Sequence, residues 1–377
     1  MKIVIAPDKF RGSLNTLEVI AAITEGVLAA SPEAMIWSTP LSDGGEGTME
    51  ILTEQAHGTL VSVEVNDPLN RKITAQYGFS QATETAYIEM ATASGLGLLL
   101  KEEYNPLLTS TYGTGQLILD AVSRGAKSVI IGIGGSATTD GGIGMAAALG
   151  YRFFERDGPE LPAVGGSMNR IHRIDTTNVD PRIQGINFII ACDVTNPLFG
   201  ENGAACVYGP QKGATSEMVQ LLDEGLMNLS LIATKTFGED ISVIPGAGAA
   251  GGLGAGGIWF LNAKLQEGIQ IVMDHVRISE KIQGADLVIS GEGKVDEQTL
   301  QGKVIKGLAV LCKQHHVPLV VLCGTLAISS QELQEAGVTY AASIINRPMT
   351  LEQAQSEAFG LLKDATIQLV RLFYKAR

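Results

Sequence analysis

The chain has 377 residues, a length that predicts about two domains. A hydrophobic content of 45% and a mean hydropathy of +0.18 are enough for a buried core and exclude a disordered chain. The net charge is −13, from 27 basic and 40 acidic residues, which argues against nucleic acid as a partner. A small anion could still bind locally, at helix N-termini and a few basic side chains.

The sequence carries no signal for secretion or for membrane insertion. Its apolar runs are broken well before the roughly 18 residues that a spanning helix needs. The initial "KIVIAPD" has none of the regions of a signal peptide. The four cysteines lack CxxC spacing and predict reduced, unpaired thiols. We therefore expect a cytoplasmic protein without a membrane partner.

Strands and helices alternate at both ends of the chain. The N-terminal pattern predicts a strand at 2–6, a helix at 16–30, a strand at 35–38 and a helix from Gly47. The C-terminal pattern predicts strands at 287–290, 319–323 and 341–345, with helices at 304–314, from Ser329, and from 351 to about 373. Such alternation predicts a parallel α/β sheet, but neither end alone has enough strands for one. We predict a parallel-sheet domain built jointly from residues 1–70 and 286–377.

The middle of the chain has a different pattern. The segment "LVSVEVNDPLNRKITAQYGF" predicts a hairpin that turns at Asp67-Pro68-Leu69-Asn70. Apolar runs in "SVIIGIGG" and "INFIIACDV", and a helical pattern from Ser216, follow it. Residues 71–285 are therefore predicted to form an inserted second domain of mixed α/β type.

Glycine is enriched, with 45 residues gathered in blocks. The P-loop signature and the protein-kinase signatures do not occur. "GIGGSATTDGG" loosely satisfies a dinucleotide fingerprint, but hydroxyl residues stand where the helix of such a site should already run. We interpret Gly134, Gly135 and Ser136 as backbone donors to a phosphate or carboxylate. For "PGAGAAGGLGAGG", helix packing and ligand contact explain the glycines equally well.

Acidic residues follow the predicted strands. Asp8, Asp43, Glu46, Asp193, Glu292 and Asp296 stand at or after strand ends, where ligands of parallel sheets bind. Helix capping is an alternative role for Asp43, but it explains little for Asp193, which precedes Asn-Pro rather than a helix. Histidines in metal-binding spacing do not occur. Glycine loops, acids able to hold Mg²⁺ and basic residues together indicate phosphoryl transfer.

Nine segments resemble, in order and over essentially the entire chain, those of the bacterial glycerate kinase family of type I. They are "IAPDKFRGS", "SDGGEGT", "IEMATASGL", "TSTYGTGQLI", "IGIGGSATTDGG", "ACDVTNPLFG", "YGPQKGA", "PGAGAAGG" and "ISGEGKVDEQTLQGK". The resemblance implies ATP-dependent phosphorylation of D-glycerate to 2-phosphoglycerate. It also implies a flavodoxin-like domain joined to an inserted α/β domain. The chain departs from the expected pattern at "DKFRGS", where Lys9 and Arg11 keep positive charge but leave Lys9 outside the predicted site.

Roles for the site residues follow from the chemistry that this resemblance implies, in a cleft expected between the two domains. Asp193 is a base or metal anchor, and Glu292 and Asp296 hold Mg²⁺. The phosphate clamps are Lys212, Lys294 and Lys303, and Lys294 and Asp296 count with Asp193 as catalytic. Arg11 and Asp43 face glycerate, Arg11 as a fork for its carboxylate. The backbone contacts to nucleotide are predicted at Gly134, Gly135, Ser136, Gly291 and Gly293.

Two other classes of protein stay open from the residues alone. A nicotinamide-dependent oxidoreductase acting on a small hydroxy acid is one, and a non-catalytic ligand-binding protein is the other. The expected partners are ATP and D-glycerate, with Mg²⁺ as cofactor, and self-association is left open.

Overall fold

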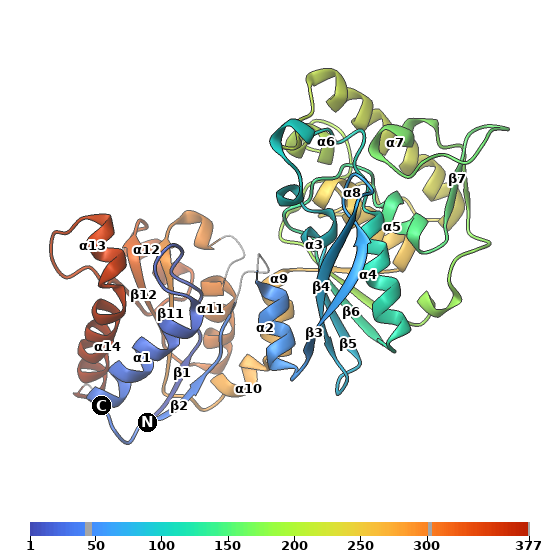
Figure 1. Cartoon of the computed structure of the whole chain (residues 1–377). Coiled ribbons are helices and arrows are strands. Elements are labelled where there is room, and N and C mark those ends of the chain that lie inside the picture. The colour runs from blue at the N-terminus through green and yellow to red at the C-terminus, as the bar shows by residue number, and fades with distance from the viewer. Residues whose placement is uncertain (42–46, 301–303, 376–377) are drawn as a thin grey trace. The chain divides into compact units, whose positions relative to one another are not determined.

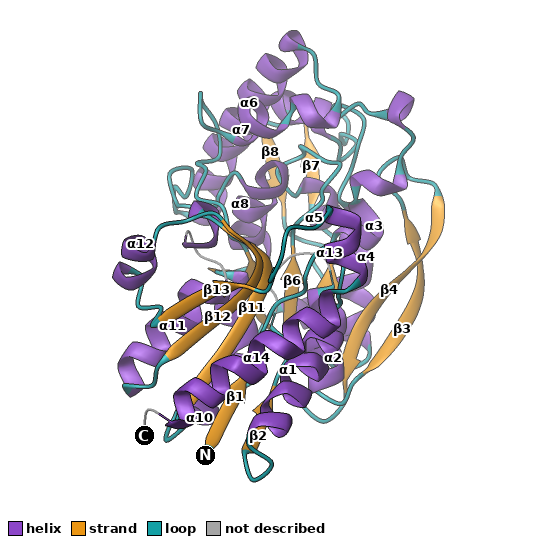
Figure 2. Ribbon diagram, turned by 90° about the vertical axis from the view of Figure 1, so that its left-hand side faces the viewer, coloured by secondary structure: helices purple, strands orange, loops and turns teal. Residues whose placement is uncertain are grey.

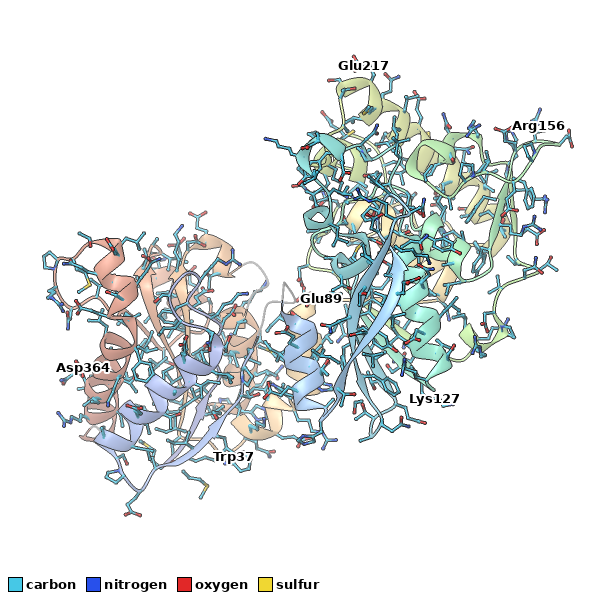
Figure 3. All side chains as sticks on the ribbon, viewed as in Figure 1. Trp37, Glu89, Lys127, Arg156, Glu217 and Asp364 are labelled. Atoms are coloured by element: carbon cyan, nitrogen blue, oxygen red, sulfur yellow. The ribbon has the colours of Figure 1, made fainter. Side chains whose placement is uncertain are left out.

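The computed structural model describes residues 1–41, 47–300 and 304–375 (Figure 1). Its contacts divide the chain into two compact units: unit 1 comprises Met1–Asp43 and Gly268–Arg377, and unit 2 comprises Gly44–Glu267. No helix in the described ranges is both long enough and apolar enough to cross a membrane. Surface charges such as Asp364 in unit 1 and Arg156 and Glu217 in unit 2 project outward from their own unit (Figure 3).

Unit 1 is built on a parallel five-stranded sheet. Its strands are β1 (Lys2–Ile5), β2 (Met35–Ser38), β11 (Leu287–Val295), β12 (Leu319–Leu326) and β13 (Tyr340–Ser343). They lie in the order β13-β12-β11-β1-β2, and all neighbours are parallel. This order is that of flavodoxin-like sheets. The predicted fold class is confirmed, since the first strand of the chain pairs with a strand from its C-terminal part.

The helices of unit 1 are α1 (Thr16–Ala30), α9 (Gly268–His275), α10 (Ile278–Ile282), α11 (Val304–His315), α12 (Ser330–Glu335), α13 (Leu351–Ser356) and α14 (Ala358–Lys375). Figure 2 shows α1 and α14 side by side on one face of the sheet. A capping box between Asn15 and Glu18 starts α1. The apolar side chains of α1 pack with those of α14 and of the sheet in one core. The single helix predicted from 351 to about 373 is divided in two: α13 ends at Ser356, Glu357 is its C-cap, and α14 begins at Ala358.

Unit 2 is built on a mixed six-stranded sheet. Its order is β10-β9-β6-β5-β4-β3, from β3 (Thr59–Asn66), β4 (Lys72–Ser80), β5 (Thr85–Glu89), β6 (Ser128–Gly132), β9 (Asn187–Ala191) and β10 (Lys264–Gln266). The pairs from β10 to β5 are parallel, whereas β5, β4 and β3 run antiparallel. A separate ribbon joins β7 (Arg152–Phe154) and β8 (Arg173–Asp175). The helices are α2 (Thr48–Gln55), α3 (Ala91–Ser94), α4 (Tyr112–Ser123), α5 (Ile143–Ala148), α6 (Ala204–Tyr208), α7 (Ser216–Phe237) and α8 (Ala249–Leu261).

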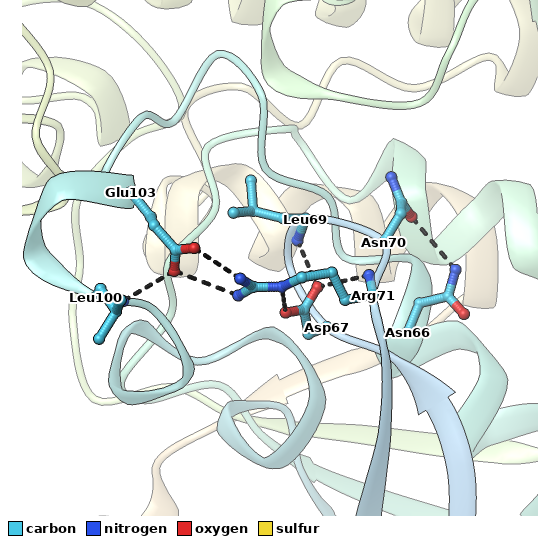
Figure 4. Close-up of polar contacts among 7 residues, drawn as sticks. All are labelled: Asn66, Asp67, Leu69, Asn70, Arg71, Leu100 and Glu103. Carbon is cyan, nitrogen blue, oxygen red and sulfur yellow. Dashed lines mark hydrogen bonds and ion pairs between the residues drawn. The ribbon is translucent and has the colours of Figure 1, made fainter.

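The predicted hairpin turn after residue 66 is present (Figure 4). The carboxylate of Asp67 accepts from the amides of Leu69 at 2.8 Å and Arg71 at 2.9 Å, and Asn70 takes a left-handed backbone with φ 64°. Arg71 donates from Nε to Asp67 Oδ2 at 2.6 Å and from Nη1 to Glu103 Oε1 at 2.6 Å. The carboxylates of Asp67, in the turn, and of Glu103, outside it, therefore fix the turn between β3 and β4.

The limits of the two units differ from the predicted limits at 70/71 and 285/286. The first predicted limit cut the hairpin at its turn, although β3 pairs with β4 from Thr59 to Asn66. Antiparallel pairing keeps both strands in one sheet, so the first crossing falls at Asp43 and Gly44. The second falls at Glu267 and Gly268, because α9 and α10 contact α11 of unit 1.

The contact between α1 and α14 depends on the absence of a side chain at Gly26. A Cβ at this position would lie 2.6 Å from Thr366 Cβ and 2.7 Å from the carbonyl oxygen of Lys363. We predict that Gly26→Ala lowers the stability of unit 1 by about 1–3 kcal/mol, the usual cost of overpacking a close contact.

Gly360→Ala is the matched control, since Gly360 lies in the same helix pair with no heavy atom within 4 Å of an added Cβ. It should be neutral or stabilise by up to about 1 kcal/mol through helix propensity. The chain has two tryptophans, Trp37 on β2 and Trp259 in α8. Urea unfolding followed by Trp37 fluorescence in a Trp259→Phe background reports unit 1. Equal shifts for both variants would contradict the packing argument.

Candidate functional site

A pocket of about 440 Å³ lies in unit 2 at the carboxyl ends of two neighbouring parallel strands. Gly132 at the end of β6 pairs with Ala191 at the end of β9, so the segments that follow both strands meet at one edge. This edge is where parallel sheets bind ligands. The pocket brings together five predicted site residues: Gly134, Gly135, Ser136, Asp193 and Lys212.

The glycine segment after β6 forms one wall of the pocket. Gly134 and Gly135 are exposed, and Gly135 has a left-handed backbone with φ 70°. The segment is fixed from behind, because Leu96 donates its amide to the Gly135 carbonyl at 2.8 Å and Ala137 donates to Ser94 at 2.9 Å. The next helix, α5, begins only at Ile143. The dinucleotide fingerprint is thus not followed by the helix that such a site requires.

Asp140, to which the sequence interpretation gave no role, lies fully buried behind this wall. Its carboxylate accepts from the amide and hydroxyl of Thr111, both at 2.8 Å, and from the amides of Gly142 at 3.1 Å and Gly144 at 3.2 Å. Burial raises the pKa of Asp140, and these hydrogen bonds oppose the rise. Asp140 therefore ties the start of α4 to the start of α5.

Lys212 comes to the pocket from a short 3₁₀ helix, Pro210–Lys212, and is only 2% exposed. Its Nζ donates to the carbonyl oxygen of Thr138 at 2.5 Å. Burial lowers the pKa of Lys212 to about 7, and the nearby Asp140 carboxylate opposes that shift only in part. A charged ammonium at this place has almost no contact with solvent, so an anion next to it would stabilise the charged form.

Asp193 follows β9 and is exposed at the pocket, next to Cys192. The Cys192 thiol donates to the Val194 carbonyl at 3.3 Å, and burial raises its pKa. A thiol with a raised pKa is a poor nucleophile. Across the pocket, the Tyr208 hydroxyl donates to Asn196 Oδ1 at 2.6 Å. Asp193 is thus the lining group best suited to accept a proton from a bound hydroxyl.

The start of α8 closes the pocket with an unusual backbone. Ala250, Gly251 and Gly252 are left-handed in succession, with φ of 52°, 71° and 91°. A Cβ on Gly251 would lie 2.1 Å from the Thr138 carbonyl oxygen, the acceptor of Lys212. Glycine is required there by packing, whereas Ala249 and Ala250 line the pocket. Packing therefore explains glycine at 251, and ligand contact stays a prediction for the part of this segment that lines the pocket.

In unit 1, the strand predicted at 287–290 is longer than predicted and includes "GEGKV". β11 continues to Val295 because Glu292 pairs with Cys323 and Lys294 with Thr325 of β12. A Cβ on Gly291 would lie 2.5 Å from the Leu322 carbonyl oxygen. Close packing on the neighbouring strand therefore explains glycine at 291, and contact of Gly291 and Gly293 with a nucleotide stays a prediction.

One hydroxyl contacts both Glu292, within β11, and the backbone of Asp296, just after it. Thr299 Oγ1 donates to Glu292 Oε1 at 2.6 Å and accepts from the Asp296 amide at 3.1 Å. Lys294 Nζ pairs with Asp296 Oδ2 at 2.8 Å. Three hard oxygen groups thus lie within one short segment. Among the described residues, groups of three or more His, Cys, Asp or Glu side chains placed to hold a metal do not occur.

Arg11 and Gly293 line a second pocket, of about 260 Å³, in unit 1. Its other walls are largely apolar and include Phe10, Ile344 and Met349. Arg11 is exposed there, which leaves its guanidinium accessible to an anion. The predicted site residues Asp43 and Lys303 lie outside the described residues, as does Glu46.

The buried Lys212 predicts a specific pH dependence of the stability of unit 2. Between pH 7 and 10.5 the unfolded chain holds the Lys212 proton and the folded protein has lost it, so stability rises with pH by up to about 1.4 kcal/mol per unit. Below pH 7 this contribution is constant. We expect Lys212→Met to be more stable than the parent at pH 7, with the gap narrowing by about 1–2 kcal/mol at pH 8.5.

Urea unfolding followed by Trp259 fluorescence in a Trp37→Phe background measures this gap, with Lys235→Met in α7 as an exposed control. The control variant should show no change of gap with pH. A gap that is constant over the same range for Lys212→Met would show that this side chain keeps its proton.

Comparisons with known proteins agree with this arrangement. The family model described as "Glycerate kinase family" matches residues 3–374. A glycerate kinase of Halalkalibacterium halodurans is 46% identical over 96% of both chains, and the glycerate 2-kinase of Escherichia coli is 43% identical over 95% of this chain and 94% of its own. A crystal structure assigned to glycerate kinase 2 of Salmonella typhimurium is 40% identical, with a TM-score of 0.90 over 100% of this chain and 99% of that one. The chain therefore belongs to the glycerate kinase family.

Proposed function

We propose that this protein transfers the terminal phosphoryl group of ATP to the C2 hydroxyl of D-glycerate, giving 2-phosphoglycerate and ADP. Membership of the glycerate kinase family supports the substrate class. The observation that carries the proposal is the unit 2 pocket, where a glycine wall, an exposed carboxylate and a buried lysine share one strand edge.

The residues of this pocket suit the parts of a phosphoryl transfer. Asp193 accepts the proton of the attacking hydroxyl, the new O–P bond forms, and the bond to the ADP oxygen breaks. The exposed backbone of Gly134 and Gly135 approaches the phosphate oxygens, and the ammonium of Lys212 compensates their charge. This reaction needs no nucleophilic side chain, which accords with the raised pKa of Cys192, the thiol that lines the pocket.

Mg²⁺ is assigned, within this proposal, to Glu292 and Asp296 of unit 1. Two carboxylates with a neighbouring Thr299 hydroxyl are hard oxygen groups of the kind that Mg²⁺ takes, together with water and phosphate oxygens. When bound, the ion neutralises phosphate charge. Asp296 is paired with Lys294, so this ammonium would have to give way to the metal and could then serve a phosphate.

The reaction is tested directly by product analysis. We expect ADP release from ATP to require both D-glycerate and Mg²⁺, and phosphorus NMR to place the new phosphate on the C2 oxygen. ADP release without glycerate would contradict the proposal. Phosphate on C3 would show that the protein is a glycerate kinase that phosphorylates the other hydroxyl, and would contradict the proposed position. Reduction of a nicotinamide cofactor by D-glycerate would instead support the oxidoreductase.

The role of Asp193 is tested by Asp193→Asn, which keeps the shape and removes the base. Turnover should fall on the order of a hundredfold or more, the range that general bases contribute. Glu201→Gln is the control, because Glu201 is an exposed acid of the same unit that does not line the pocket. If both variants lose activity to a similar extent, the loss reflects charge in general and Asp193 is not the base.

The metal assignment is tested by Asp296→Asn, since asparagine keeps the hydrogen-bonding shape and is a poor Mg²⁺ ligand. We expect an unchanged unfolding midpoint, a turnover lower by on the order of a hundredfold, and a higher Mg²⁺ requirement. Near-normal turnover at limiting Mg²⁺ would show that the carboxylate is structural.

A further inference from the structure

The buried amine of Lys212 has an incomplete set of partners for a charged group. An ammonium has three N–H donors, and the hydrogen bond found for this one goes to a neutral acceptor, the Thr138 carbonyl oxygen, at 2.5 Å. The side chain is 2% exposed and lines the pocket. The residual donor capacity therefore lies next to the space that a ligand would occupy.

The nearby carboxylate of Asp140 is held by other donors. Oδ2 accepts from the amide and hydroxyl of Thr111 and from the Gly144 amide, and Oδ1 accepts from the Gly142 amide. The hydrogen bond of Lys212 goes to the Thr138 carbonyl oxygen instead of to this carboxylate. Four donors directed at both oxygens fit the ionised form of Asp140.

The remaining titratable groups at this pocket are Asp193, Cys192 and Tyr208. Burial raises the pKa of both Cys192 and Tyr208, so these two stay protonated at pH 8. Asp193 is an exposed carboxylate. Lys212 is thus the cationic group of the pocket that can change charge near neutral pH.

We propose that a phosphoanion in the unit 2 pocket binds directly to Nζ of Lys212, and that its binding brings one proton from solvent onto this nitrogen. The nitrogen lone pair forms the new N–H bond, and the buffer acid supplies the proton. The inference rests on the proposed function for the nature of the anion, which is a phosphoryl group of the nucleotide or of the phosphorylated product.

Burial and a bound anion shift the pKa of Lys212 in opposite directions. In the empty pocket, burial lowers the pKa of Lys212 to about 7, so the amine is mostly neutral at pH 8. A phosphate oxygen within hydrogen-bonding distance favours the charged form. The pocket then holds its ligand as an ion pair, and the protein without ligand carries no unpaired charge on the buried Lys212 nitrogen.

The test counts protons by calorimetry. ADP and 2-phosphoglycerate are titrated without metal into the protein at pH 8, in buffers of different ionisation enthalpy. At this pH the phosphates of both ligands are already mostly ionised, since the second pKa of such a phosphate is about 6. We expect an uptake approaching one proton per bound ligand at pH 8 and a smaller uptake at pH 7. ADP and 2-phosphoglycerate separate the nucleotide phosphate from the product phosphate as the source.

Lys212→Arg is the matched variant, because a guanidinium stays charged at every accessible pH. It should bind the same ligand with no proton uptake, and Lys212→Met should bind at least tenfold more weakly. Binding to the parent protein without uptake at pH 8, uptake that persists in Lys212→Arg, or no binding of either ligand would each overturn the inference. Proton-coupled binding without glycerate-dependent ADP release would refute the proposed function and leave this inference standing.

Discussion

The pocket of unit 2 depends on how one buried charge is satisfied. An ionised carboxylate removed from water costs several kcal/mol unless hydrogen bonds replace its hydration. Asp140 obtains them from Thr111 at the start of α4 and from Gly142 and Gly144 at the start of α5. The two helix starts are thereby held to the segment that contains Thr138, whose carbonyl oxygen is the acceptor for Lys212. The lysine is therefore positioned through a group that does not line the pocket.

Much of the architecture could be predicted from the sequence because its determinants are local. The capping box of Asn15 and Glu18 and the buried stripe of α1 place that helix at 16–30, as predicted. The sequence also allowed the grouping of Gly134, Gly135, Ser136 and Asp193 to be predicted, because parallel strands end at a common edge of the sheet. The family resemblance, carried by nine segments in order, is confirmed over nearly the whole chain.

The predictions that failed involve partners distant in sequence. The strand predicted at 287–290 was too short, because pairing with 319–326 extends it through "GEGKV", and the Leu322 carbonyl requires glycine at 291. Asp140 resembles a turn residue in "TTDGG", and its burial becomes visible only when Thr111, some thirty residues earlier, is placed against it. A lysine in "YGPQKGA" is by default a surface residue. Nothing local shows that Lys212 is buried.

The discontinuity of unit 1 bears on how the chain is made. β1 is synthesised before unit 2, yet its partner β11 starts at Leu287, after all of unit 2. At roughly 5–20 residues per second, synthesis of the intervening chain takes on the order of 15–60 s. During this time the apolar strand of Ile3, Val4 and Ile5 has β2 but lacks the neighbour on its other side. Unit 2 is complete at Glu267, whereas unit 1 still needs β11, β12 and β13 and the helices that follow them, so nascent chains can form the second unit before the first.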